Sequence, residues 1–287
     1  MRELNYTHKG EEKLVREILK SHFGFSKGVI TSLKTDSGMF VNNEPVTVRR
    51  IMKENDILTI KLPDEKSENI VPVEMELDII YEDEDILVVN KPSGMPTHPS
   101  IRHFTDTLAN GVCYMYKDRD FMFRAVTRLD RETSGIVLIA KNRNSAHKLG
   151  EQLKNGMVEK TYYALCEGVF EKSEGEIEAP IARMCESIIL RHVSKIGKYS
   201  KTLYKVISKE NEMSFVEVTP VTGRTHQIRV HLSYIGHPIF ADYLYGNRKD
   251  GEKLRLHCGK LVFMHPVTNK KITLSCDIPD YFLHKIL

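Results

Sequence analysis

One stretch of this chain, Arg128-Leu129-Asp130-Arg131-Glu132-Thr133-Ser134-Gly135, leads directly into the apolar run Ile136–Ala140. The run is short and rich in β-branched residues, which predicts a buried strand that starts at Gly135. An aspartate followed by threonine, serine and glycine is also typical of an ordinary turn, in which hydroxyl groups cap backbone groups. The stretch therefore predicts a core strand and leaves two interpretations for Asp130, a turn residue or a functional carboxylate.

Strand signals dominate the chain after residue 70. The segments Leu77–Tyr81 and Ile86–Lys91 flank an acidic turn and predict a hairpin. Apolar spacing predicts helices around residues 146–153 and 228–235, the second ended by Gly236. Because strands outnumber helices without a regular βαβ alternation, the sequence predicts an α+β fold. Further strands are expected at Thr161–Cys166, Leu203–Ile207, Phe215–Thr219, Arg255–Phe263 and Lys271–Ser275.

A polar segment divides the chain near residue 70. Residues 63–69 carry a proline and several charges between two apolar segments, which is typical of a linker. Before it, apolar spacing predicts two short helices around residues 14–19 and 30–33. An Asn42-Asn43 turn predicts a hairpin over residues 39–48, since asparagine tolerates positive φ, and a strand follows at Ile57–Lys61. We expect a small unit (1–62), a linker (63–74) and a large domain (75–287).

Composition and charge exclude several classes of protein. The chain of 287 residues has a net charge of +3, and without a run of about 18 or more uncharged apolar residues a membrane span is not expected. The first residues are charged throughout and lack the features of a secretory signal, which indicates a cytoplasmic protein. The five cysteines are scattered and form no C-x-x-C pair, so reduced, mostly buried thiols are expected.

The charges are unevenly distributed along the chain. Between Arg183 and Lys205 stand six basic residues and one acid, Glu186. Such a stretch is commonly a solvated face, but it would also neutralise the phosphates of a nucleic acid. Composition alone leaves both interpretations open.

A second polar segment, Pro220–Leu232, contains Gly223-Arg224-Thr225 ahead of a predicted helix. This order is expected to place Arg224 near the positive N-terminus of that helix, where an arginine would attract a carboxylate. His226 and His231 are not at the i, i+4 spacing of a helical zinc pair, and no acidic third ligand stands nearby. No metal site is expected.

Four blocks of the chain, taken in order, resemble the RluA-type RNA pseudouridine synthases. They are Asp85–Pro99, Arg128–Gly135, Lys160–Gly168 and Val221–Gly246, the last with a Gly-Arg-Thr-His-Gln-Ile-Arg core. Residues 256–266 are similar to the C-terminal strand of that family. The resemblance spans about residues 77–275 and implies a catalytic domain with a mixed, largely antiparallel sheet. It also implies a monomer that acts on a structured RNA stem-loop, ribosomal rather than transfer RNA, without a cofactor.

The first 62 residues resemble the S4-like (alpha-L) RNA-binding domain that is shared with a ribosomal protein of the small subunit. The hairpin Phe40–Val46 and the turn Lys53–Ile57 carry this similarity. The helices hold fewer basic residues than a strong RNA binder is expected to have. A packing module with reduced RNA affinity is therefore the alternative.

The chemistry implied by the resemblance needs one carboxylate. Isomerisation of uridine breaks the C1′–N1 bond, turns the uracil and joins C5 to C1′, so no redox change or net hydrolysis occurs. A carboxylate near C1′ can attack it, or stabilise charge while acting as a base on the ribose, and both roles remain open. By resemblance Asp130 is this carboxylate and Arg224 pairs with it. Tyr162 is expected to stack on the base and handle the C5 proton, with Tyr163 on the opposite face of the strand.

The resemblance also implies contacts to the RNA. Arg128 stands two residues before Asp130, so both side chains leave an extended segment on one face. It is expected to help displace the flipped nucleotide. Thr127 departs from the family pattern, which commonly has histidine there, and little effect on the chemistry is expected. The residues expected to contact RNA are Arg128, Arg183, Arg191, Lys195, Lys198, Lys201, His226 and Arg229.

Two alternatives stand beside an RNA isomerase. The first is a catalytically inactive RNA-binding or ribosome-assembly protein on the same fold, although such a protein has no reason to keep Asp130, Tyr162 and Arg224 together. The second is a hydrolase with Asp130 as nucleophile. Glycosidases use a pair of carboxylates, and no second carboxylate is evident in the sequence. The isomerase is therefore favoured.

Overall fold

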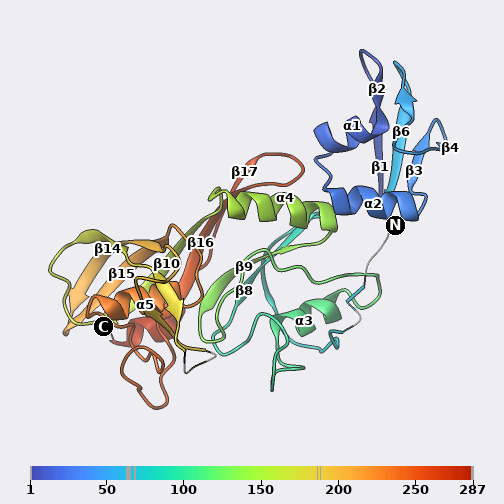
Figure 1. The fold of residues 1–287 in the computed structure, drawn as a ribbon. Helices are drawn as coiled ribbons and strands as arrows, with labels where there is room; N and C mark the ends of the chain where they lie inside the picture. Colours follow the sequence, from blue (N-terminus) through green and yellow to red (C-terminus); the bar gives the residue numbers. More distant parts are fainter. Residues whose placement is uncertain (1, 63–65, 68, 186, 188, 286–287) are drawn as a thin grey trace.

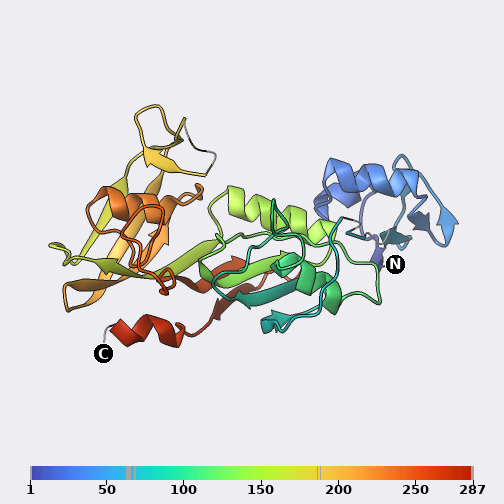
Figure 2. The same ribbon diagram turned by 90° about the horizontal axis from the view of Figure 1, so that it is seen from below.

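The computed structural model describes residues 2–62, 66–67, 69–185, 187 and 189–285. A nine-stranded sheet runs through the larger part of the chain (Figures 1 and 2). Across it the strands follow the order β11-β14-β15-β10-β16-β9-β8-β7, and β17 pairs with β16. Among the described strands of this sheet, β16 and β9 are the parallel neighbours and the other pairs are antiparallel. The predicted α+β fold with a largely antiparallel sheet is confirmed.

The bounds of the strands agree with most of the ranges expected from the sequence. The segment Lys271–Ser275 was predicted to the residue. The short strands β11, β12 and β13 were not predicted, because their few residues carry no clear apolar alternation. The strands of the large sheet and the β12–β13 pair are β7 (Asp78–Glu82), β8 (Ile86–Lys91), β9 (Ser134–Ala140), β10 (Glu159–Glu167), β11 (Glu174–Glu178), β12 (Ile181–Arg183), β13 (Arg191–Val193), β14 (Lys201–Glu210), β15 (Met213–Pro220), β16 (Leu256–Met264) and β17 (Lys271–Ser275).

Strand β9 lies in the centre of the main hydrophobic core. All of its residues are buried, and it pairs with β8 on one side and with β16 on the other. Gly135 has φ +112°, and a Cβ there would collide with the backbone of Cys258. Glycine is therefore required where β9 approaches β16. The apolar run forms the predicted strand and fixes the position of the polar stretch before it.

Two helices lie on one side of the large sheet (Figure 2). Helix α4 (Arg143–Lys154) packs against β9 and β16, and α5 (Gln227–Tyr234) packs against β13, β14 and β15. Gly236, with φ +86°, follows α5 as predicted. Helix α3 (Leu108–Met115) was not predicted, since Asn110 and Gly111 interrupt its apolar pattern. A short 3-10 helix, η1 (Asp280–Lys285), ends the described chain. No described helix has the length and apolar character needed to span a membrane.

Residues 2–62 form a small sheet with a hydrophobic core of its own (Figure 1). Its strands follow the order β1-β6-β3-β4, and β2 pairs with β5. Strand β1 was not predicted, because it has few apolar residues, Leu4 and Tyr6. Its strand conformation depends on pairing with β6. The elements are β1 (Arg2–Thr7), β2 (Lys13–Leu14), α1 (Val15–Ser21), α2 (Lys27–Thr35), β3 (Met39–Val41), β4 (Glu44–Pro45), β5 (Ile51–Met52) and β6 (Ile57–Leu62).

The segment predicted as a linker is described only in part, since residues 63–65 and 68 lie outside the described residues. Its remainder is bonded to the larger part of the chain. Ser67 N–H donates to the carbonyl of Phe121 at 3.0 Å, and Phe123 N–H donates to Ser67 Oγ at 2.8 Å. The side chain of Asn110 in α3 donates to the carbonyl of Val71 at 2.7 Å. These bonds attach Ser67 and Val71 to the larger part of the chain.

The cysteines are free thiols. Cys113, Cys166 and Cys258 are buried, Cys276 is partly buried and Cys185 is exposed. Burial raises the pKa of the Cys258 thiol to about 12. The expectation of reduced, mostly buried thiols is confirmed.

Candidate active site

A buried lysine holds the loop that carries Asp130. Lys91 ends β8 and is fully buried. Its ammonium group donates to the carbonyls of Pro92 at 2.9 Å, Met95 at 2.7 Å and Arg131 at 3.2 Å. Burial lowers the pKa of Lys91 to about 7, although the charge of Asp130 opposes this shift. Lys91 thus ties the backbone after β8 to the backbone beside Asp130.

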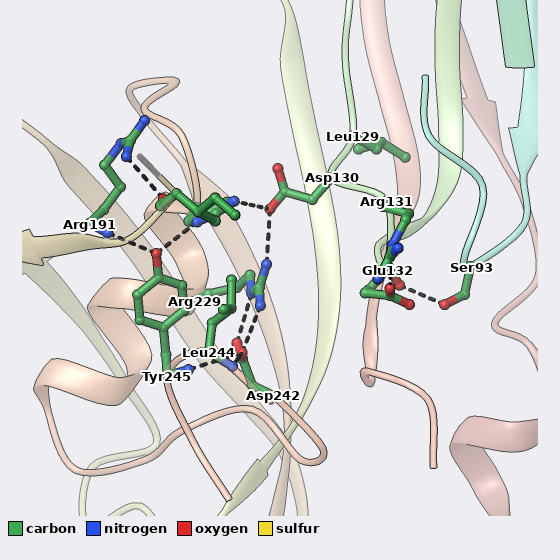
Figure 3. Close-up of polar contacts among 12 residues, drawn as sticks. Ser93, Leu129, Asp130, Arg131, Glu132, Arg191, Arg229, Asp242, Leu244 and Tyr245 are labelled. Atoms are coloured by element: carbon green, nitrogen blue, oxygen red, sulfur yellow. Dashed lines mark hydrogen bonds and ion pairs between the residues drawn. The ribbon is translucent and has the colours of Figure 1, made fainter. Parts of the chain in front are cut away.

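Two hydroxyl groups complete this support. Thr97 Oγ1 donates to the carbonyl of Leu129 at 2.9 Å, and Ser93 Oγ donates to the carbonyl of Glu132 at 2.7 Å (Figure 3). The loop is therefore held through its backbone carbonyls. The carboxylate of Asp130 takes no part in that support.

Asp130 lines a cleft of about 1220 Å³. The walls come from the loop 96–103, the segment 126–133, the start of β10 and the turn between β15 and α5. Asp130 and Tyr162 both line it, so the carboxylate and the aromatic ring that the sequence predicted for the site share one cavity. A cleft of this size can hold a drug-sized ligand and more.

Arg229 and His226 are the ion-pair partners of Asp130 among the described residues. Arg229 Nη1 lies 3.5 Å from Asp130 Oδ2, and His226 Nε2 lies 3.7 Å from the same oxygen. The side chain of Asp130 is 30% exposed and that of Arg229 is 2% exposed. Both contacts involve Oδ2, and in Figure 3 the other carboxylate oxygen points away from Arg229. Oδ1 is thus available to a ligand in the cleft.

Asp242 fixes the guanidinium of Arg229. Its oxygens accept from Arg229 Nε at 2.8 Å and from Nη2 at 2.7 Å, and the carboxylate is fully buried. Oδ1 of Asp242 also accepts from the backbone N–H groups of Leu244 and Tyr245 (Figure 3). Burial lowers the pKa of Arg229, but the hydrogen bond and charge of Asp242 outweigh this and raise it above its ordinary value. The arginine remains charged and presents Nη1 to Asp130.

The expected pairing of Asp130 with Arg224 is wrong. Arg224 is exposed at the cleft, and its Nε donates to the carbonyl of Tyr199 at 3.1 Å. Gly223-Arg224-Thr225 precedes α5, which begins at Gln227, as predicted, but the guanidinium of Arg224 is directed at the carbonyl of Tyr199 and not at Asp130. Arg229 lies inside the helix on its buried face and reaches Asp130. The donors of Arg229 are directed at Asp242 and Asp130, which leaves it little capacity to bind RNA, although it lines the cleft.

Tyr162 and Tyr163 face opposite sides of β10, as alternation predicts. Tyr162 lines the cleft and is 8% exposed, whereas Tyr163 stacks on Phe215 with ring centroids 5.9 Å apart. A register shift between Thr161 and Tyr162 marks a bulge in the pairing with β16. Burial, followed by Cys258 and Asp130, raises the pKa of Tyr162 well above its ordinary value. The phenol is therefore neutral, which suits stacking and makes it a poor base.

The basic residues predicted to contact RNA divide into two groups. Arg128 is exposed and lines the cleft. Arg183, Lys195 and Lys198 are exposed on or beside the β12–β13 pair. Lys201 instead pairs with Glu176 at 2.7 Å and with Glu178 at 3.5 Å, and the guanidinium of partly buried Arg191 donates to the carbonyls of Ile189 and Leu190.

The two histidines of the Gly-Arg-Thr-His segment have separate surroundings. His231 is buried in α5 with Nδ1 2.9 Å from Thr202 Oγ1 and Nε2 2.9 Å from the carbonyl of Ala179. His226 precedes α5, with Nδ1 2.7 Å from Tyr245 Oη and its other nitrogen facing Asp130. They do not form one ligand set. His226 lines the cleft, so a contact of this residue with RNA stays a prediction.

One group with metal-ligand chemistry lies away from the cleft, where donor atoms of Asp83, Asp85 and His265 fall within 4.8 Å of one another. Their hydrogen bonds account for this proximity. Asp83 Oδ2 lies 2.9 Å from His265 Nε2, and Asp85 Oδ1 accepts from Asn142 Nδ2 and Ser145 Oγ. The group stabilises the turn between β7 and β8 and its contact with α4.

The sequence did not identify five residues that support this site: Lys91, Ser93, Thr97, Asp242 and Tyr245. Lysine is almost never fully buried, so its place at the end of a strand gave no signal. Asp242 and Tyr245 fall in a segment without apolar periodicity. They stand within the block Val221–Gly246, which was the signal that could have identified them.

The geometry defines a class of protein: a carboxylate in an open cleft, oriented by a clamped arginine, with a neutral tyrosine beside it and basic residues around the opening. The profile of the family described as RNA pseudouridylate synthase matches residues 85–234. The uncharacterized RNA pseudouridine synthase YjbO of Bacillus subtilis is 40% identical over 262 residues, 90% of this chain and 93% of the relative. The chain belongs to the RNA pseudouridine synthase family.

Two further comparisons agree with this family. Ribosomal large subunit pseudouridine synthase C of Vibrio cholerae is 36% identical over 261 residues, which cover 88% of this chain and 79% of the relative. The solved structure of human RNA pseudouridylate synthase domain containing 1 matches with a TM-score of 0.62 at 30% identity. That match covers 74% of this chain and 86% of the human one. The predicted family and fold are confirmed.

Proposed function

We propose that this protein isomerises uridine to pseudouridine in ribosomal RNA, with Asp130 as the catalytic carboxylate. One observation carries the proposal: Oδ2 of Asp130 is held by Arg229 at 3.5 Å while the side chain remains 30% exposed in the cleft. A carboxylate in this state can approach the anomeric carbon of a ribose or accept a proton from it. Relatives named as synthases of the large ribosomal subunit favour ribosomal over transfer RNA.

The target uridine has to leave its stack before it can reach Asp130. Unstacking costs a few kcal/mol, and enzymes of this kind read the extruded base in a pocket. We assign Tyr162 to stacking on the uracil and Arg128, exposed at the cleft, to the space that the nucleotide vacates. No step needs a cofactor or a metal, because the base is cleaved and rejoined within one nucleotide.

We also propose a division of labour along the chain. Residues 75–287 would form the catalytic domain of a cytoplasmic monomer, and residues 63–74 the linker. Residues 1–62 would form an S4-like domain that adds RNA contacts. The separate hydrophobic core of the first 62 residues supports this division, and the packing module with reduced RNA affinity is the alternative.

A map of pseudouridines in RNA from cells that lack this protein tests the function. We expect one or more ribosomal uridines to lose modification, and to regain it with the native gene but not with Asp130→Asn. If the map of ribosomal RNA is unchanged and a pseudouridine is missing from transfer RNA, the substrate is transfer RNA and not ribosomal RNA. Recovery by the Asn variant would favour the catalytically inactive assembly factor.

The exposed basic residues beside β12 and β13 give a separate prediction for RNA binding. Replacement of Arg183, Lys195 and Lys198 by glutamine is expected to weaken binding and to make its salt dependence shallower. Each phosphate contact contributes about 0.7–0.9 to the slope of log K against log salt, so the loss of three contacts would reduce its magnitude by about 2–3.

Lys201→Gln is the matched control for this experiment. Its ammonium group is neutralised by Glu176 and Glu178, so the slope should change little although a lysine of the same stretch is removed. Titrations of a stem-loop RNA at several salt concentrations measure this slope for the triple variant and for Lys201→Gln. An unchanged slope in the triple variant would place the RNA on another face.

A further inference from the structure

His226 has an unusual backbone conformation beside Asp130. It is the residue before the first turn of α5, with φ +56° and ψ +19°. Histidine, like asparagine and aspartate, adopts this left-handed conformation more readily than most residues, and here it does so beside the candidate carboxylate. The conformation directs the imidazole between the hydroxyl of Tyr245 and the carboxylate of Asp130, with Nδ1 and Nε2 facing the two groups respectively.

The hydrogen bonds around Tyr245 determine where the protons lie. The backbone N–H of Arg191 is 3.0 Å from Tyr245 Oη and can only donate to it (Figure 3). The proton of the hydroxyl then needs an acceptor, and Nδ1 of His226 lies 2.7 Å away. A neutral imidazole that accepts at Nδ1 carries its proton on Nε2. That N–H is directed at Oδ2 of Asp130, 3.7 Å away.

At 3.7 Å the N–H of His226 and the carboxylate of Asp130 do not yet form a hydrogen bond. Contacts of this kind are often long without substrate and shorten in the complex. Arg229 holds the same oxygen from the other side at 3.5 Å. Two donors that converge on Oδ2 would fix the rotation of the carboxylate and direct Oδ1 into the cleft.

Burial of His226 supports a neutral ring, because it is the largest influence on the pKa of the imidazole. Burial lowers the pKa of the imidazole, and the charges of Arg229 and Arg191 lower it further. Asp130 and Asp242 act in the opposite direction. The titratable and charged groups that face the ring are Asp130, Arg191, Arg229, Asp242 and Tyr245.

We propose that Tyr245 fixes the Nε2–H tautomer of His226, and that His226 acts as a positioning residue for Oδ2 of Asp130. The proposal rests on the proposed function for its catalytic meaning, since the carboxylate is positioned for attack on a ribose or for its deprotonation. The tautomer itself is a property of the free protein. The tautomer of His226 and its role in catalysis can therefore be tested separately.

Long-range proton–nitrogen NMR of the protein labelled in its histidines tests the tautomer without any RNA. The signals of His226 are assigned by their loss in His226→Asn. We expect a protonated Nε2 and an unprotonated Nδ1 at about pH 7.5, because the reference pKa of histidine is about 6.5 and burial lowers that of His226. Tyr245→Phe removes the donor to Nδ1, so the Nδ1–H tautomer should become populated beside the Nε2–H tautomer that Asp130 still favours.

Tyr243→Phe is the matched control, because Tyr243 also stands near Arg229, with its ring centre 5.8 Å from the guanidinium. It should leave the tautomer of His226 unchanged. A protonated Nδ1 in the native protein would overturn the proposal. So would tautomer populations that are unchanged in Tyr245→Phe.

Two replacements of His226 separate positioning of Asp130 from support of the backbone. Asparagine suits the left-handed conformation and keeps an oxygen for Tyr245, but it is too short to donate to Asp130. Glutamine fits the backbone less well and keeps an amide N–H near the position of Nε2. We expect kcat to fall by up to about 100-fold in His226→Asn with KM for RNA nearly unchanged, and partial recovery in His226→Gln.

The outcomes discriminate between three roles. The positioning role would be overturned if His226→Asn kept the native kcat. It would also be overturned if the glutamine variant were less active than the asparagine variant. Either result would mean that the backbone conformation of residue 226 is what activity requires. A raised KM with native kcat would make His226 an RNA contact. Absence of pseudouridine formation in the native protein would contradict the proposed function and leave the NMR result standing.

Discussion

Replacement of Asp130 by asparagine is expected to lower the rate of pseudouridine formation by at least about 10⁴-fold, the size of loss that removal of a catalytic nucleophile produces. Asparagine has the same shape but lacks the charge and the second anionic oxygen. It can neither attack C1′ nor accept a proton from the ribose. Release of tritium from RNA labelled at uracil C5 measures the loss directly, because C5 exchanges its hydrogen for the bond to C1′.

The fold is expected to survive this replacement. The loop is held by the bonds of Lys91, Thr97 and Ser93 to backbone carbonyls, and these do not involve the carboxylate of residue 130. The free energy of unfolding should change by less than about 1 kcal/mol, and RNA affinity should stay close to native. Equal affinity and lost turnover together would separate chemistry from binding.

Glu132→Gln is the matched control for Asp130→Asn. Glu132 stands two residues further along the same loop, and its side chain pairs with Arg131 at 2.7 Å. Removing this charge alters the local potential by a similar amount but leaves the cleft carboxylate in place. Turnover should stay within about threefold of native. A loss in this variant as large as in Asp130→Asn would shift the chemistry away from Asp130.

The contrast between Asp130 and Arg229 shows what the sequence could predict. Asp130 was found because it stands in a short polar stretch that leads into an apolar run typical of a buried strand, and because its block resembles that of a known family. The end of a strand positions its neighbours within a residue or two. Local pattern and family resemblance therefore agree on where this carboxylate lies.

The arginine partner of Asp130 could not be predicted in the same way. Arg224 and Arg229 are both in the resembling block, and the choice depends on where α5 begins. That start is set by the left-handed conformation of His226, which no residue pattern indicates. Asp242, which clamps Arg229, comes from a segment without regular structure. Contacts between an irregular segment and a helix follow from the packed fold and are not visible in either sequence segment alone.

Arg229→Met is expected to destabilise the protein by about 3–5 kcal/mol, the cost of leaving a buried charge without its partner. Asp242 is fully buried and makes both of its salt-bridge contacts to the guanidinium of Arg229. The loss of the cation also leaves Oδ2 of Asp130 without its main donor. Urea unfolding followed by circular dichroism should show a lower midpoint with an unchanged slope.

The double variant Arg229→Met with Asp242→Asn separates the two roles of this arginine. Asparagine keeps an oxygen for the N–H groups of Leu244 and Tyr245 while removing the unpaired charge. Replacing a buried ion pair by neutral groups is often nearly neutral in stability, so about 2 kcal/mol or more should be regained relative to Arg229→Met. Activity should remain about 10²–10³-fold below native, as after loss of a preorganised donor at a reacting charge. If activity returned together with stability, Arg229 would serve the fold alone, and the orientation of Asp130 would have to come from His226.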